Sequence, residues 1–550
     1  ITKAMKKVIT MLMAIVTSVA MSAQALVWDG SAEPWTHGSG THDDPYLIET
    51  PQQLAFLAQT VNESYDFADY RFTDTCFLMT ADFDLGGDLG LDWAPIGASP
   101  SHGANRTMFA GDFDGGNHVV SNMRITTENY INAYGLFGLV SGSLIENVSL
   151  DGSCAIQLEG IYEYWEIVIG GLVSYIREGT VRNCHSFAVI ECNRLYGDMY
   201  GCYIGGVCGM LRGSLVDGCT YSGEIISDAS TNYGQVMVGG IVGEMIDSKV
   251  TDCHNSGSIY NNRIDPLYSM MFSEVDFCSG GVVGSAIGEN KSEILYCSNT
   301  GTVSVFIEEE PEHQQERYFA SGGILGSSMG FNAHFVKNKI EIRSCYNVGD
   351  VSVDVAGTGL NESACGILGV AYINDTVTVV SCYSAGTLMG DAMGGIMVTE
   401  SEKITVTNSY YLESEGCDNG YGEPKTEEYM KTEEFVEVLN ESDPVYSMDY
   451  TNENGGFPVF VNQYDGEPEA VGASNQCRAY PNPSGGMVSV VLPEGASGAS
   501  VELFSLDGRL VMSEPWVTGG IDISRLATGI YIMRVATDNG VTFEEKVVRE

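Results

Sequence analysis

The chain has 550 residues, and its 73 Asp and Glu outnumber its 26 Lys and Arg, which gives a formal charge of −47. That balance excludes a basic nucleic-acid binder, while 29 Tyr and 20 Phe within 44% apolar residues exclude a disordered acidic chain. With 66 Gly and only 18% charged residues, the composition suits a long, repetitive all-β body.

The first 25 residues have the pattern of a secretory signal peptide. Lys6 and Lys7 follow Met5, the expected start, and precede an apolar run at 8–21 and small residues at 22–25. Removal of residues 1–25 takes away three lysines and no acid, so the mature charge is 23 − 73 = −50. No later apolar run reaches the roughly 18 residues that span a bilayer. We therefore expect a protein that leaves the cytoplasm.

Residues 26–130 are expected to hold an N-terminal cap and the first coils of the repetitive body. Thr50 is a helix N-cap residue, Pro51 suits the first helical position and Gln53 completes a capping box. Leu54, Leu57, Ala58 and Val61 then share one face. This pattern predicts a short helix that covers the open end of the repeats.

Residues 131–415 contain a repeat. A Gly-Gly box followed by aliphatic residues recurs at 170, 205, 239, 280, 322 and 394, with Cys365-Gly366 in the same role. Each box except the last is followed by a segment centred on a cysteine, and these cysteines are Cys184, Cys219, Cys253, Cys297, Cys345 and Cys382. Three short strands per repeat, broken by turns, predict one coil of a parallel β-solenoid, right-handed, with aliphatic residues inward and Ser, Thr, Asn and Asp outward. Ladder neighbours project in parallel, which favours buried free thiols over disulfides.

The repeat resembles the GLUG-type repeats of secreted bacterial proteins, on the evidence of Gly135-Leu136-Phe137-Gly138, the boxes above and upstream segments such as 93–97 and 113–118. The resemblance covers roughly residues 28–461. It implies a β-solenoid scaffold of the kind found in surface adhesins and in non-catalytic arms of IgA-specific metallopeptidases, and it does not imply a reaction.

Two groups of acids are candidate Ca²⁺ ligands: Asp82, Asp84 and Asp88 in one loop, and Asp112 and Asp114 in another. Asp before Gly is also a common turn former, so structural turns are the alternative. We expect no other cofactor and no metal site of the zinc type, because neither CxxC nor HExxH spacing is present.

For catalysis, Asp217 and Asp252 lie near equivalent repeat positions and could form the carboxylate pair of a glycosidase or lyase. A surface rich in Asp also brings carboxylates together by chance. We assign no catalytic residue, and a polysaccharide-processing enzyme remains the alternative function.

The segments before the Gly-Gly boxes vary in length and are aromatic, which predicts a binding ridge along one edge of the solenoid. Packing onto the coil beneath is the alternative. The ridge residues are Tyr162, Tyr164, Trp165, Tyr200, Tyr203, Tyr233, Tyr268 and Phe272.

Residues 416–475 are expected to form an acidic C-terminal cap and linker, with a short helix after Thr432. From 476 to 550, short strand candidates and turns predict a small Ig-like β-sandwich. Asp507-Gly508 is a hairpin turn and Gly529 suits a left-handed turn.

This last segment resembles the type A C-terminal sorting domain of the type IX secretion system of Bacteroidetes. The matching motif residues are Pro481, Asn482, Pro483, Asp507, Gly508, Arg509, Gly529, Tyr531 and Lys546. The resemblance implies translocation by that machinery, cleavage by a sortase and, in many members, covalent attachment to a lipopolysaccharide, which would be the chain's link to the membrane.

Together these features predict a secreted or surface-anchored, adhesin-like scaffold that binds a glycan or a host surface protein and has no catalytic activity. A structural surface component is a third alternative.

Overall fold

The computed structural model describes most of the chain between residues 26 and 549. The described ranges are 26–63, 70–98, 107–127, 133–163, 166–197, 201–231, 235–263, 276–308, 318–328, 337–356, 361–372, 374–399, 401–450, 452, 454–461, 478–480, 487–491, 498–505, 509–515, 521–523, 525–526, 529–537 and 542–549. The predicted signal peptide lies outside them. The chain divides into two compact units, residues 1–424 and 425–550.

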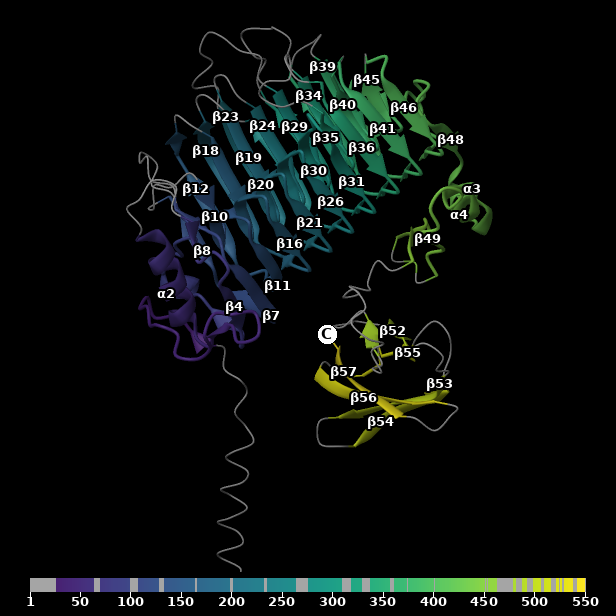
Figure 1. The fold of residues 1–550 in the computed structure, drawn as a ribbon. Helices are drawn as coiled ribbons and strands as arrows, with labels where there is room; N and C mark the ends of the chain where they lie inside the picture. The colour runs from purple at the N-terminus through teal and green to yellow at the C-terminus, as the bar shows by residue number, and fades with distance from the viewer. Residues whose placement is uncertain are drawn as a thin grey trace, which may run out of the picture. The chain divides into compact units, whose positions relative to one another are not determined.

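The first unit is a parallel β-solenoid, as the repeat predicts (Figure 1). Each coil contributes strands to four sheets, which we number I to IV in the order in which a coil visits them. Sheet I comprises β9 (Ala133–Tyr134), β14 (Ile167–Gly170), β19 (Gly201–Gly205), β24 (Gln235–Gly239), β29 (Asp276–Gly280), β34 (Tyr318–Gly322), β39 (Asn361–Cys365) and β44 (Met393–Gly394). Sheet II comprises β3 (Tyr70–Arg71), β6 (Met108–Phe109), β10 (Phe137–Ser141), β15 (Val173–Arg177), β20 (Cys208–Arg212), β25 (Val242–Ile246), β30 (Val283–Ile287), β35 (Leu325–Ser327), β40 (Leu368–Ala371) and β45 (Met397–Thr399).

Sheet III takes two strands from each regular coil. Its strands are β1 (Leu26–Val27), β2 (Tyr46–Ile48), β4 (Cys76–Met79), β5 (Phe83–Asp84), β7 (Asp112–Ser121), β11 (Leu144–Leu150), β16 (Thr180–Arg182), β17 (His185–Ser186), β21 (Leu215–Asp217), β22 (Thr220–Tyr221), β26 (Lys249–Thr251), β27 (His254–Asn255), β31 (Ser292–Leu295), β32 (Ser298–Asn299), β36 (Lys339–Arg343), β37 (Tyr346–Asn347), β41 (Thr376–Val380), β42 (Tyr383–Ser384), β46 (Ile404–Thr407), β47 (Tyr410–Leu412) and β48 (Glu423–Lys425). Sheet IV comprises β8 (Arg124–Thr126), β12 (Ala155–Glu159), β13 (Tyr162–Glu163), β18 (Val189–Gly197), β23 (Glu224–Thr231), β28 (Ser258–Arg263), β33 (Val303–Ile307), β38 (Val351–Val355) and β43 (Leu388–Met389).

A regular coil therefore has five strands where the sequence predicts three, because the two most conspicuous motifs are corners. The Gly-Gly box lies between sheets I and II: a Cβ on Gly206 would stand 2.2 Å from the carbonyl oxygen of Gly240 and 2.3 Å from the Tyr221 ring. The residue before each Cys position adopts a left-handed conformation, as Asn183, Gly218 and Asp252 do at φ of 49°, 61° and 52°. Glycine, Asn and Asp tolerate that conformation best, which explains their recurrence there.

The interior is mostly aliphatic, but the predicted outward placement of polar residues is wrong for several of them. Serines such as Ser279, Ser285 and Ser321 are buried, and so are Asn255, Asn299 and Asn347. The Asn255 Nδ2 donates to Asn299 Oδ1, and the Asn299 Nδ2 to Asn347 Oδ1, each at 2.7 Å. Stacking in register lets these three amides bond to one another, so their burial leaves these amide groups with hydrogen-bond partners.

The 14 described cysteines form no disulfide bonds with one another, and 13 of them are buried, with only Cys76 partly exposed. Burial raises the pKa of Cys253 and Cys297 well above its ordinary value, and a buried, protonated thiol is unreactive.

We expect a thiol reagent to label only Cys76 rapidly among these 14 positions in the native protein, and all 14 after denaturation. Mass spectrometry of labelled peptides gives the count, and Cys76→Ala is the control. Fast labelling of several ladder thiols in folded protein, or missing thiols after denaturation, would contradict this arrangement.

A helix covers the N-terminal coils, as predicted (Figure 1). The helix α2 spans Pro51–Asn62, and the Thr50 side chain accepts a hydrogen bond from the Gln53 backbone N–H. Its buried residues include Leu54, Leu57 and Val61. The Asn62 side chain at its end accepts from the backbone N–H groups of Gly97 and Ala98, at 3.0 and 2.8 Å, which fixes the helix on the first coils. The short 3-10 helix η1 spans Gly87–Leu89.

The second unit begins with the helices α3 (Glu427–Met430) and α4 (Glu433–Leu439), and Thr432 caps α4 as the sequence predicts. The hairpin of β49 (Tyr446–Ser447) and β50 (Val459–Phe460) follows. The antiparallel C-terminal strands are β51 (Arg478–Tyr480), β52 (Met487–Val491), β53 (Gly498–Ser505), β54 (Leu510–Pro515), β55 (Ile521–Asp522), β56 (Gly529–Thr537) and β57 (Thr542–Arg549). They form two sheets that enclose Val501, Leu503, Ile521 and Met533, which is the predicted β-sandwich.

Candidate functional site

The strands on either side of the connections from sheet IV to sheet I end and begin along one edge of the solenoid. The strand ends stack in register: Gly197 pairs with Thr231, and Ile307 with both Arg263 and Val355. The strands that follow also begin in register. The intervening segments, which we call the edge connections, are 198–200, 232–234, 264–275, 308–317 and 356–360, and thus differ in length from 3 to 12 residues.

Most residues of the predicted aromatic ridge belong to these connections and to the one before them, but Tyr162 and Tyr203 lie in strands. Tyr164, Trp165, Tyr200, Tyr233, Tyr268 and Phe272 lie outside the described residues. The backbone of Tyr162 lies in β13, in register with Tyr196.

One member of the ridge is placed differently from the prediction. Tyr203 is 3% exposed and packs with Val168 and Met237 in a second apolar cluster, separate from the main core. Tyr203 is therefore a packing residue, since strand alternation turns it into this cluster, and it is not available as a contact for a large ligand.

The acids proposed for Ca²⁺ mostly hold turns and strands together. Asp82 Oδ1 accepts from the Val119 N–H at 2.9 Å, Asp84 Oδ1 from the Gly86 N–H at 2.8 Å, and Asp112 Oδ1 from the Leu144 N–H at 2.8 Å. Asp114 Oδ1 accepts from the Gly116 N–H at 2.8 Å, and Asp88 lies in η1. Within the described ranges, no group of three or more His, Cys, Asp and Glu side chains could hold a metal ion.

The structure brings the carboxyl groups of Asp217 and Asp252 close enough to interact. Asp217 lies on β21, in register with Thr251, and Asp252 occupies the next corner. Burial raises the pKa of both, and the charge of Asp252 raises that of Asp217 further. Arg182 pairs with Asp217 at 3.4 Å, and Lys249 lowers the pKa of both acids. This is a polar surface cluster with perturbed acids.

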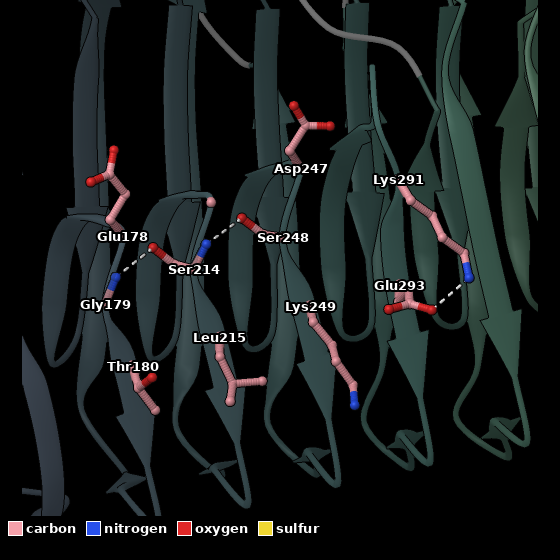
Figure 2. Close-up of a pocket in the computed structure, with 11 residues that line it drawn as sticks. Glu178, Gly179, Thr180, Ser214, Leu215, Asp247, Ser248, Lys249, Lys291 and Glu293 are labelled. Carbon is pink, nitrogen blue, oxygen red and sulfur yellow. Dashed lines mark hydrogen bonds and ion pairs between the residues drawn. The ribbon is translucent and has the colours of Figure 1, made fainter. Parts of the chain in front are cut away.

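A pocket of about 410 Å³ lies beside this cluster, at the turn between sheets II and III (Figure 2). It crosses four coils, and the residues that line it are Glu178, Gly179, Thr180, Gly213, Ser214, Leu215, Asp247, Ser248, Lys249, Lys291 and Glu293. The serines fix its back wall: Ser214 Oγ accepts from the Gly179 N–H at 3.2 Å, and Ser248 Oγ from the Ser214 N–H at 3.1 Å.

This pocket was not predicted from the sequence, although a pattern in the repeats marks its position. Glu178, Gly213 and Asp247 occupy the same turn in three successive coils, at φ of 56°, 57° and 46°. Alignment of the repeats on their Cys residues would have shown Glu and Asp where the intervening coil has Gly, a sign that those acids hold a strained backbone position.

A buried acid was also missed. Glu244, on β25, is 3% exposed, and its Oε1 has no hydrogen-bond partner among the described residues. Burial raises its pKa to about 8, with a smaller contribution from the negative charge of Glu166. At neutral pH this carboxyl group is therefore mostly protonated.

In the sorting segment, Arg509, Gly529, Tyr531 and Lys546 are described. Gly529 begins β56, where it pairs with Arg549, and the Tyr531 ring is buried in the sandwich core. Pro481, Asn482, Pro483, Asp507 and Gly508 lie outside the described residues, but β53 and β54 form the hairpin that Asp507-Gly508 predicts.

Comparison with known proteins identifies this segment. Residues 478–550 match the secretion system C-terminal sorting domain. The chain is therefore an exported protein, secreted or attached to the cell surface, and the domain implies interaction with the type IX secretion machinery. Among the described residues, the search for membrane-spanning helices finds none of sufficient length and apolarity.

Two curated relatives match parts of the chain. A protein of Evansella cellulosilytica named "Putative Gly-rich membrane protein" is 35% identical over 125 residues, which are 22% of this chain and 13% of the relative. The "Halomucin" of Haloquadratum walsbyi is 28% identical over 169 residues, 30% of this chain and 2% of the relative. The chain thus spans a small part of the length of either relative.

Two solved structures are also similar. One is described as a "putative immunoglobulin A1 protease" from Bacteroides ovatus, with 16% identity, a TM-score of 0.37 and coverage of 78% of this chain and 95% of that one. The other, described as "IgA1 Protease", has 15% identity, a TM-score of 0.32 and coverage of 67% and 21%. Likeness at this level does not carry an activity over to this chain.

Proposed function

We propose that this chain is an adhesin-like binding scaffold, a GLUG-type repeat protein of Bacteroidetes that the type IX system delivers to the outer surface. Its partner is a glycan or a host surface protein, and its role is attachment without catalysis. The matched sorting domain supports the location, and the solenoid supplies a long rigid body.

The observation that carries this proposal is the register of the strand ends that flank the edge connections. In repeat proteins, insertions of variable length project from one face, and that face is commonly the one that binds. Here the register of sheets I and IV brings five such segments to one edge. Their aromatic residues, among them Tyr268 and Phe272, are the type that contributes most to recognition surfaces.

A polysaccharide-processing enzyme is the second candidate, and the pair of Asp217 and Asp252 favours it. Their raised pKa values are the property that a general acid in glycoside cleavage requires. Arg182 occupies one side of Asp217, however, and a structural ion pair perturbs a carboxyl group in the same way.

The deciding experiment incubates residues 26–550 with arrayed glycans, mucins and host matrix proteins, and assays released sugars in the same wells. We expect saturable binding without product. The double substitution Tyr164→Ala, Trp165→Ala should weaken binding by about tenfold, because buried aromatic anchors dominate such interfaces. Tyr450→Ala, which removes an exposed aromatic ring of the second unit, is the matched control.

Three results would go against the proposal. Sugar release that Asp217→Asn abolishes would favour the enzyme. If Tyr450→Ala lost as much binding as the double substitution, the edge connections would not be the binding site. No binding and no product on any surface would favour a structural surface component.

A further inference from the structure

The pocket between sheets II and III is remote in the coil from the edge connections, which join sheets IV and I. Its floor is a row of three residues in register, with Leu215 between Thr180 and Lys249. Leu215 is half-buried, so part of its apolar side chain faces the pocket, as Figure 2 shows. The floor therefore offers one apolar contact flanked by a hydroxyl group and an ammonium group.

The rim has a gap in its middle. Glu178 and Asp247 lie two coils apart, with their backbones separated by roughly 10 Å, and Gly213 occupies the turn between them. A Cβ on Gly213 would approach only Glu178 Cγ, at 3.9 Å, so the space above this glycine is open. Two carboxylates thus flank an opening directly beside Leu215.

Lys249 is a lysine of the pocket whose ammonium group is available to a ligand. Among the described residues it makes no ion pair or hydrogen bond, although its charge interacts with Asp217 and Asp252 at longer range. The other lysine of the pocket, Lys291, is held by Glu293 and Glu341 at 2.6 and 2.7 Å. Three ammonium N–H donors of Lys249 therefore remain for a ligand.

Acceptors stand on either side of this donor. Asp247 accepts from the Asn290 backbone N–H at 2.8 Å and from its side chain at 3.2 Å, which holds the carboxylate in place and leaves further lone pairs. Glu178 is exposed and pairs only loosely with Arg177, at 3.6 Å. The Thr180 hydroxyl group can donate or accept.

We propose that this pocket binds a neutral, hydroxyl-rich sugar residue of a glycan chain. Sugar hydroxyl groups can donate to Glu178 and Asp247 and accept from Lys249, while a C–H face of the ring covers Leu215. The carboxylates of Glu178, Asp247 and Glu293 repel an anionic sugar, and the ammonium group of Lys249 repels a basic peptide. The volume of about 410 Å³ lies within the range of small-ligand sites. This inference rests on the proposed binding function only in taking the ligand to be a glycan.

The test uses isothermal titration of residues 26–550 with cellotetraose, mannotetraose, lacto-N-neotetraose and the sialylated form of the last. We expect at least one neutral tetrasaccharide to bind, and the sialylated form to bind more weakly than its parent. Lys249→Met should weaken the neutral interaction about tenfold, as expected for loss of a charged hydrogen-bond donor. Lys339→Met is the matched control, because Lys339 is an exposed lysine of the same sheet outside the pocket.

Thr180→Val is the second variant, and circular dichroism verifies that each variant is folded. If the double substitution at Tyr164 and Trp165 abolishes glycan binding while Lys249→Met and Thr180→Val retain it, the pocket is not the site, and the proposed function stands. Tighter binding of the sialylated form overturns the neutral class. Binding to a host protein but to no tetrasaccharide overturns the inference alone, and the absence of any partner overturns both proposals.

Discussion

Glu244→Gln should stabilise the protein at neutral pH by about 3 kcal/mol, the largest gain that we expect from one substitution. In the folded state the pKa of Glu244 is about 8, against an ordinary value of 4.5. At pH 7 the unfolded chain carries this group ionised, whereas folding forces it to take up a proton. Gln keeps the shape of the neutral acid and has no proton to take up.

The direction of the pH dependence follows from proton linkage. Between pH 4.5 and 8 the folded state binds more protons at Glu244 than the unfolded state, so this group makes the free energy of unfolding fall as the pH rises through that window. Below pH 4.5 both states are protonated, and the wild type and Glu244→Gln should be equally stable.

Denaturant titrations of both proteins at pH 4.5, 6, 7 and 8 measure this difference. The control is Glu289→Gln, because Glu289 is exposed. A difference between wild type and Glu244→Gln that stays constant with pH would show that Glu244 is ionised in the folded protein, and that its unpartnered Oε1 has a partner in solution.

Gly206→Ala should destabilise the solenoid by about 3 kcal/mol or more, because overpacking against fixed backbone cannot be relieved by a side-chain rotation. The new Cβ would meet the Gly240 carbonyl oxygen at 2.2 Å and the Tyr221 ring at 2.3 Å. Gly240 directly follows β24, which pairs with β19, and Tyr221 lies on β22, which pairs with β27, so the register of the sheets fixes both positions.

Thermal unfolding and limited proteolysis would test this effect, with Gly152→Ala as the matched control. A Cβ on Gly152 would meet no atom within 4 Å, so that variant should unfold at the wild-type temperature. Because each coil of a solenoid contacts only its neighbours, we expect the first proteolytic cleavages of Gly206→Ala in the coils around residue 206. Unchanged stability would mean that the Gly-Gly corner can open.

Much of the fold follows from the sequence because it depends on local or strictly repeated features. The N-cap at Thr50, with Pro51 after it, specifies a helix start within four residues. The regular recurrence of Gly-Gly and Cys predicts stacked coils, and stacking alone places the thiols of Cys253 and Cys297 next to each other in the interior.

The candidate binding sites are harder to predict from the sequence than the fold. The acids of the loops at 82–88 and 112–114 match a metal-binding composition, but Asp84 and Asp114 hold local turns, as the alternative reading of these loops predicts. Asp82 and Asp112 bond to backbone N–H groups that only the folded coil brings to them. Tyr203 is an aromatic residue of the kind found on binding surfaces, but it is buried because Met237 and Val168 stack beside it in adjacent coils. Burial by neighbouring coils is not encoded in the segment itself.

The sequence by itself determined the repeat, the capping helix and the C-terminal sandwich, since each arises from short-range patterns or from periodicity. Only the tertiary structure decided that the two motifs are corners, that Asn255 and its stacked partners face inward, that Lys249 makes no ion pair with the described residues, and that Glu244 is buried. The physical reason is the same in each case: the environment of a side chain in a solenoid is set by residues one coil away, for example 34 positions along the chain for Leu215 and Lys249 and 41 for Val242 and Val283.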